Sequence, residues 1–125
     1  MESFCGAFPV LKGKEKAGRE YAETCMGSRR KECLEYFQRV GLMKQSWHLQ
    51  NLPQGTVVLV YFEAPNAAKT FELLAQAKEP FTLWYKQQMQ QITGVDLNKP
   101  PEGPMPEQIF SLSRYGESRS TAASQ

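Results

Sequence analysis

His48 is the side chain best suited to acid–base chemistry in this sequence, because imidazole gains or loses its proton near neutral pH. It is the single histidine of the chain, and no cysteine or aspartate stands near it at the spacing of a zinc motif. We therefore expect no metal site. Strand alternation turns His48 away from Trp47 and Leu49. A structural or exposed histidine is the simpler interpretation, and a general base in a pocket is the alternative.

Four large aromatic side chains are candidates for lining a ligand pocket between sheet and helices: Trp47, Tyr61, Trp84 and Tyr85. The alternative is that they form the core of a small α+β domain, which is the commoner use of such residues. The sequence contains no glycine-rich phosphate loop, no GxSxG motif and no dinucleotide-binding fingerprint. We expect no cofactor.

The cysteines Cys5, Cys25 and Cys33 are odd in number and lack CxxC spacing, which argues against a disulfide framework. On one continuous helix, Cys25 and Cys33 would lie about 12 Å apart at a rise of 1.5 Å per residue, beyond the reach of a disulfide. Cys33 falls on an apolar helical stripe, where it is interpreted as a small buried hydrophobic residue rather than a nucleophile.

Composition and charge exclude several classes of protein. With 125 residues, of which 41% are hydrophobic, the chain fits one folded domain, which we place at residues 1–112, followed by a polar tail at 113–125. The net charge of +2 is small, and the basic residues of the first third alternate with acidic ones, so we expect no nucleic-acid partner. No run approaches the ~20 apolar residues of a membrane span. The start lacks the basic region of a signal peptide, so we expect a cytoplasmic location.

The first half of the chain predicts a strand, a helical region and a hairpin. Residues 4–11 are apolar, and Pro9 places this strand at a sheet edge or ends it. Residues 15–40 show helical periodicity, interrupted at Gly27. A hairpin follows, with alternating residues 42–51, a proline–glycine turn, and β-branched and aromatic residues at 56–62.

The second half predicts two helices, a stiff connector and a last strand. Asn66 is expected to cap the first helix, and Pro80 to begin the second, which Gly94 ends. Residues 95–106 carry four prolines and a glycine, typical of an extended connector. Residues 107–112 are expected to form the final strand.

This order of elements, βαββαβ, is that of a ferredoxin-like α+β fold with an antiparallel sheet. Helices cover one face of such a sheet, yet residues 56–62 are apolar on both faces. The open face therefore needs a partner, and a second copy of the chain would supply it. Burial of roughly 800 Å² per subunit would match a standard interface, and the connector would reach along the partner.

Several segments are similar to uncharacterised bacterial members of the dimeric α/β-barrel superfamily, which includes antibiotic-biosynthesis-type monooxygenases. They are Ser28-Arg29-Arg30-Lys31-Glu32, Trp47-His48-Leu49-Gln50, Glu79-Pro80-Phe81-Thr82-Leu83-Trp84, Gly94-Val95-Asp96-Leu97 and Pro100-Pro101-Glu102-Gly103-Pro104-Met105-Pro106-Glu107. The resemblance spans most of residues 4–112. It implies a ferredoxin-like homodimer and assigns no activity.

Two functions follow as expectations. The first is a ligand-binding or structural homodimer that holds a small apolar or aromatic molecule. The second is a cofactor-independent monooxygenase acting on a small aromatic or polyketide-like substrate, as the resemblance implies for oxygenases of the superfamily. A pocket that reaches His48 or Tyr61 would favour the enzyme, and an interior filled with side chains would favour the binding or structural protein.

Overall fold

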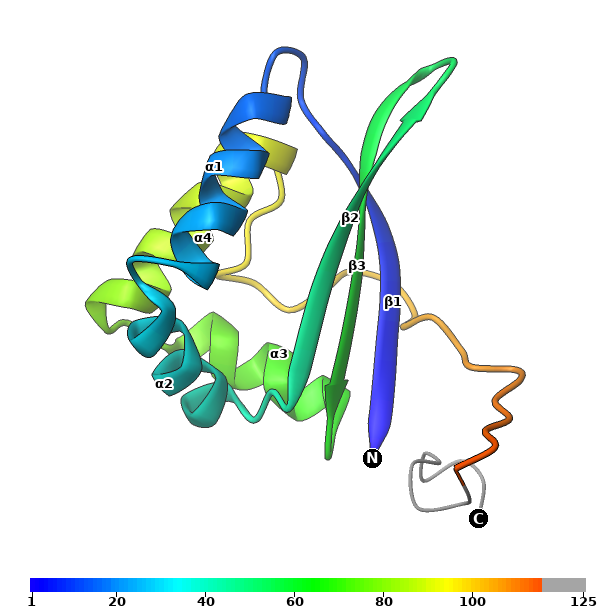
Figure 1. The fold of residues 1–125 in the computed structure, drawn as a ribbon. Coiled ribbons are helices and arrows are strands. Elements are labelled where there is room, and N and C mark those ends of the chain that lie inside the picture. The colour runs from blue at the N-terminus through cyan, green and yellow to red at the C-terminus, as the bar shows by residue number, and fades with distance from the viewer. Residues whose placement is uncertain (116–125) are drawn as a thin grey trace.

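One three-stranded antiparallel sheet and a layer of helices on one of its faces make up the fold (Figure 1). The structure is a computed structural model, and it describes residues 1–115. Within those residues the order is β1, α1, α2, β2, β3, α3, α4, so the predicted α+β class and antiparallel sheet are confirmed. None of the helices in this part of the chain is both long and apolar enough to cross a bilayer.

The central strand of the sheet is β3 (Gly55–Ala64), which pairs with β1 (Glu2–Pro9) on one side and β2 (Lys44–Leu52) on the other. The predicted hairpin is confirmed, with Leu52 opposite Gly55 across the turn. β1 is an edge strand, as Pro9 predicted. Central β3 carries the most apolar sequence because it is flanked by strands on both edges and packed by helices.

The helices are α1 (Glu15–Met26), α2 (Arg30–Val40), α3 (Ala67–Gln76) and α4 (Pro80–Thr93). The predicted interruption at Gly27 is confirmed as a break between α1 and α2. Asn66 caps α3 as expected, accepting a hydrogen bond of 3.0 Å from the Lys69 backbone N–H. Pro80 is the first residue of α4.

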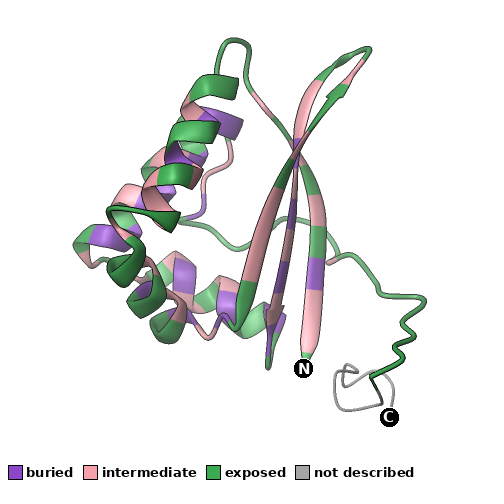
Figure 2. Cartoon of the chain, in the orientation of Figure 1, coloured by how far each residue is buried: buried purple, intermediate pink, exposed green. Residues whose placement is uncertain are grey.

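Alternate residues of β3 divide the sheet into two faces. Val58, Val60, Phe62 and Ala64 are buried beneath the helices, and their partners across the sheet, such as Phe4 and Trp47, share that face. Val57, Leu59 and Tyr61 point to the opposite, open face and are half-buried. Figure 2 shows the buried residues gathered where helices and sheet meet.

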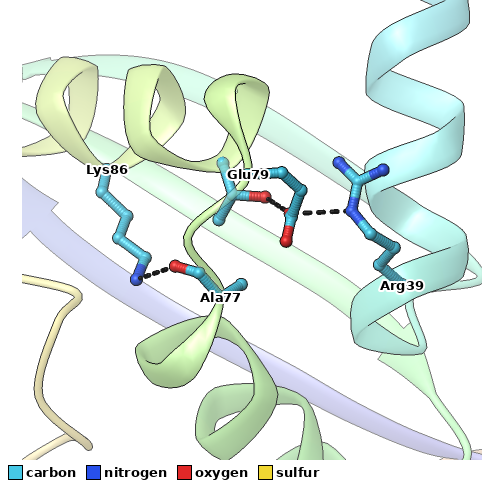
Figure 3. A network of polar contacts seen from close by, with 5 residues as sticks. Arg39, Ala77, Glu79 and Lys86 are labelled. Carbon is cyan, nitrogen blue, oxygen red and sulfur yellow. Dashed lines mark hydrogen bonds and ion pairs between the residues drawn. The ribbon is translucent and has the colours of Figure 1, made fainter.

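Polar contacts around Glu79 and Lys86 fix the helices to one another (Figure 3). The Arg39 guanidinium of α2 donates to the Glu79 carboxylate at 2.7 Å, and the hydroxyl of Thr82 donates to the same carboxylate. The Lys86 ammonium donates to the carbonyl oxygens of Ala77 at 2.9 Å and of Ala75 at 3.1 Å, at the end of α3. These contacts hold α2 against the start of α4 and the end of α3 against the middle of α4.

The predicted last strand is wrong: residues 107–112 form no strand in the structure. The segment leaves the domain as an exposed arm (Figures 1 and 2), with Ile109, Phe110 and Leu112 exposed by 88%, 77% and 83%. Within the described residues the sheet therefore lacks the fourth strand of the ferredoxin-like order. A strand forms only when backbone partners are within reach, and the proline-rich connector directs this segment away from the sheet. Of the predicted tail, residues 116–125 lie outside the described part.

Candidate functional site

A cleft of about 380 Å³ lies between α1, α2 and the edge strand β2. We call it the thiol cleft, because Cys25 of α1 and Cys33 of α2 both line it. Its other walls are mainly apolar and aromatic, and Arg30 is the one cationic side chain among them. The residues of these walls are Tyr21, Ala22, Met26, Arg30, Leu34, Phe37, Gln45, Ser46 and Trp47. A concave, mainly apolar site with a few polar groups is the usual form of a small-molecule site.

Trp47 separates the thiol cleft from a second groove. This second groove, of about 360 Å³, is lined by Trp47 and Ala22 and also by Arg19 and His48; we call it the histidine groove. The indole Nε1 of Trp47 is buried and has no hydrogen-bond partner within residues 1–115. A buried N–H group without an acceptor costs about 1–3 kcal/mol.

Tyr21 is the aromatic residue that connects the site to the core. Its ring centroid lies 4.8 Å from that of Trp47, 5.6 Å from that of Trp84 and 5.9 Å from that of Tyr85. Burial raises the pKa of Tyr21 well above its usual value, and the neighbouring Tyr85 adds to the effect. Tyr21 is therefore a neutral phenol at physiological pH and serves as a hydrogen-bond donor. Tyr21 was not among the predicted site residues, and its helical spacing from Ala17 and Cys25 is the signal that could have found it.

The break between α1 and α2 brings Cys25 and Cys33 together. The expected separation of about 12 Å assumed one continuous helix, and that assumption is wrong for this chain. The chain turns at Gly27, where a Cβ atom would stand 2.9 Å from the carbonyl oxygen of Glu23. Glycine is the residue that fits this close approach. The two thiols consequently meet, and Cys33 forms a hydrogen bond with Cys25.

Arg29 places a positive charge beside this thiol pair. Its guanidinium forms two hydrogen bonds with the Glu32 carboxylate, of 2.8 and 3.0 Å. It also lies over two aromatic rings, 4.9 Å from the centroid of Phe81 and 4.6 Å from that of Trp84. The side chain is thus held at both its edge and its face. Its hydrogen bonds with Glu32 also lower the pKa of that carboxyl group.

The four aromatic pocket candidates do not line one pocket. Trp47 lines the thiol cleft. Trp84 is half-buried on α4 next to Arg29, and Tyr85 is a core residue, 3% exposed, whose pKa burial raises to about 12. Tyr61 lies on the open face of the sheet, where its hydroxyl donates to the Glu63 carboxylate at 2.6 Å.

His48 stands opposite Leu59 in the sheet and is exposed, turned away from Trp47 as the strand alternation predicted. It reaches the histidine groove from the outer edge of β2. Among residues 1–115, no group of three or more histidine, cysteine, aspartate or glutamate side chains is placed to hold a metal ion.

Comparison of the chain with family models, with curated proteins and with solved structures gave no match. The chemistry of the thiol cleft and of the two sheet faces is therefore the basis for assigning a function.

Proposed function

We propose that the protein is a homodimer that binds a small aromatic or apolar ligand in the thiol cleft of each copy. The buried indole N–H of Trp47, which lacks an acceptor among the described residues, is the observation that carries the proposal. A ligand that carries a hydrogen-bond acceptor would satisfy this N–H once the indole turns toward the cleft. The rings of Tyr21, Phe37 and Trp47 match an apolar or aromatic body.

Arg30 narrows the choice of ligand. It lines the cleft and is exposed, so its charge lies near the rim. A carboxylate on the ligand would pair with Arg30 at the rim of the cleft. An aromatic carboxylate combines these features, and 2-naphthoate is a suitable probe because its two fused rings are rigid and apolar.

Binding of 2-naphthoate, followed by calorimetry, tests the proposal. Ala22 lines both the thiol cleft and the histidine groove, so Ala22→Leu fills the space beside Trp47. We expect saturable binding to the parent and at least a tenfold loss in Ala22→Leu. Ala68→Leu is the matched control, because it adds the same atoms at an exposed position of α3. Equal binding by both variants would overturn the assignment of the cleft.

Native mass spectrometry of the protein purified from its own host covers ligands other than the probe. We expect a retained organic compound, displaced by 2-naphthoate. The absence of a retained compound, together with no binding of 2-naphthoate, would contradict the ligand-binding role and leave the structural role of the dimer.

Two apolar regions, one half-buried and one exposed, support the homodimer. The open face of the sheet presents Val57, Leu59 and Tyr61, and the arm presents Ile109 and Phe110. In our proposal two copies pack their open faces together, and the arm of each lies along the sheet of the other, where residues 107–112 gain the strand pairing that completes a ferredoxin-like sheet and the dimeric barrel.

Light scattering on the full chain tests this arrangement. We expect twice the chain mass of 14.2 kDa for the parent. Leu59→Arg places a charge at the centre of the open face and should give the monomer, whereas Leu83→Arg, at an exposed site on α4, should leave the dimer intact. A monodisperse parent at the mass of one chain would contradict the dimer.

A cofactor-independent oxygenase is the second candidate, and the observation that favours it is the groove that reaches His48. In this role His48 would remove a proton from an electron-rich phenol, which then reacts with oxygen. Oxygen uptake with a dihydroxynaphthalene as substrate, compared between the parent and His48→Gln, decides between the two roles. Uptake that depends on His48 would favour the oxygenase, and no uptake would favour the binding protein.

A further inference from the structure

Cys25 and Cys33 form a pair of interacting thiols in a position that a small oxidant can reach. Cys25 lies in the last turn of α1 and Cys33 in the first turns of α2. Both are free and half-buried, and both line the thiol cleft. The helix break at Gly27 turns two residues that are distant on a continuous helix into neighbours.

The surroundings make the two thiols unequal. Hydrogen bonding from Cys33 is the largest effect that lowers the pKa of Cys25, and a second hydrogen bond from the Tyr21 hydroxyl and the charge of Arg29 act in the same direction. The same contact with Cys25, together with burial, raises the pKa of Cys33. Cys25 is therefore the thiol that ionises first, and Cys33 keeps its proton and donates it. A thiolate beside a protonated thiol is the arrangement found in reactive dithiols.

We propose that Cys25 and Cys33 are a redox-active dithiol, which hydrogen peroxide oxidises to a disulfide that links α1 to α2. In the first step the Cys25 thiolate attacks one peroxide oxygen, the O–O bond breaks, and hydroxide leaves, so Cys25 becomes a sulfenic acid. In the second step the Cys33 sulfur attacks the Cys25 sulfur, the S–O bond breaks, and water leaves with the Cys33 proton. Both sulfurs are oxidised by one electron each, and peroxide is reduced to two molecules of water.

The disulfide would change the cleft itself. Cys25 would no longer accept the hydrogen bond from the Tyr21 hydroxyl. The disulfide would also join the last turn of α1 covalently to the first turns of α2, and both helices line the thiol cleft. Oxidation should therefore alter ligand binding in the thiol cleft, although formation of the disulfide does not require the proposed ligand.

The experiment uses the full chain carrying Cys5→Ser, because Cys5 is the exposed third thiol, on β1. The folded protein is treated with one equivalent of hydrogen peroxide, denatured, and alkylated with N-ethylmaleimide. We expect the loss of two hydrogen atoms and no alkylation. Trypsin cleaves after Arg29, Arg30 and Lys31, so the disulfide appears as two cross-linked peptides that dithiothreitol separates.

Single-cysteine variants in the same background test the assigned roles, with far-UV circular dichroism to verify folding. In Cys33→Ser, peroxide should leave Cys25 as a sulfenic acid that dimedone traps. In Cys25→Ser, Cys33 should react at least tenfold more slowly. Free thiols in the folded parent after peroxide treatment would overturn the proposal. Equal rates for the two cysteines would overturn the assignment of Cys25 as the nucleophile.

Discussion

Two glycines of the first helical region should respond to the same substitution with opposite signs. Gly18 lies inside α1 and its N–H bonds to the Lys14 carbonyl at 3.0 Å. A Cβ atom at this position would meet only the Ile92 Cγ2 atom within 4 Å, at 3.7 Å, which is an ordinary van der Waals contact. Alanine is favoured over glycine within a helix by about 1 kcal/mol. We expect Gly18→Ala to raise the free energy of unfolding by about 1 kcal/mol.

Gly27→Ala should have the opposite effect. Its new Cβ would stand 2.9 Å from the Glu23 carbonyl oxygen, which is a backbone atom and cannot turn aside as a flexible side chain would. Relief of such a contact requires the break between α1 and α2 to shift, at a cost of about 1–3 kcal/mol. The shift would also separate Cys25 from Cys33, so the yield of the disulfide after peroxide treatment should fall.

Urea denaturation followed by circular dichroism measures both changes, since the midpoint shifts while the slope stays constant for a two-state unfolding. The two variants control for each other, because each adds one methyl group to the same helical region. A loss of stability in Gly18→Ala would refute the reasoning about space beside Ile92. A neutral Gly27→Ala would refute the steric origin of the helix break.

Three further predictions concern the core and the polar contacts. Hydrogen bonds from Thr82 and Arg39 lower the pKa of the Glu79 carboxyl group. The ionised carboxylate therefore stabilises the fold fully above about pH 5, and this stabilisation is lost as the pH falls through the lowered pKa. We expect the acid unfolding of Glu79→Gln to be less steep than that of the parent. Lys86→Met leaves the carbonyl oxygens at the end of α3 without their donor and should cost about 2 kcal/mol in urea unfolding; an unchanged midpoint would contradict this. Ile92 is 1% exposed, and Ile92→Ala should cost about 2–4 kcal/mol by the same assay, whereas Ile109→Ala on the arm should cost nothing in the monomeric Leu59→Arg background.

The sequence was sufficient to predict the elements whose signals are local. The turn between β2 and β3, the cap at Asn66 and the start of α4 at Pro80 each depend on residues next to one another in the chain, and each was confirmed. The break at Gly27 was also visible as a gap in the helical pattern. Local signals of this kind act through backbone conformation and hydrogen bonds within a few residues.

The last strand could not be predicted in the same way. Residues 107–112 include the apolar side chains Ile109, Phe110 and Leu112, as a strand would, but pairing depends on where the preceding connector leads, which is a property of the whole fold. In the structure the connector carries this segment away from the sheet, and the Gln108 side-chain amide donates one hydrogen bond, of 3.0 Å, to the Ser3 hydroxyl of β1.

The candidate site was decided by tertiary structure. The sequence determined that Trp47 and His48 face opposite ways, because alternation along a strand is local. It could not show that Tyr21 connects Trp47 to the core, or that Cys25 and Cys33 meet, since these contacts depend on the angle at which α2 leaves α1. That angle is set at Gly27 and by the packing of both helices against α4. The sequence determines which reactive side chains the protein has. The turn between α1 and α2 decides which of these side chains lie next to one another.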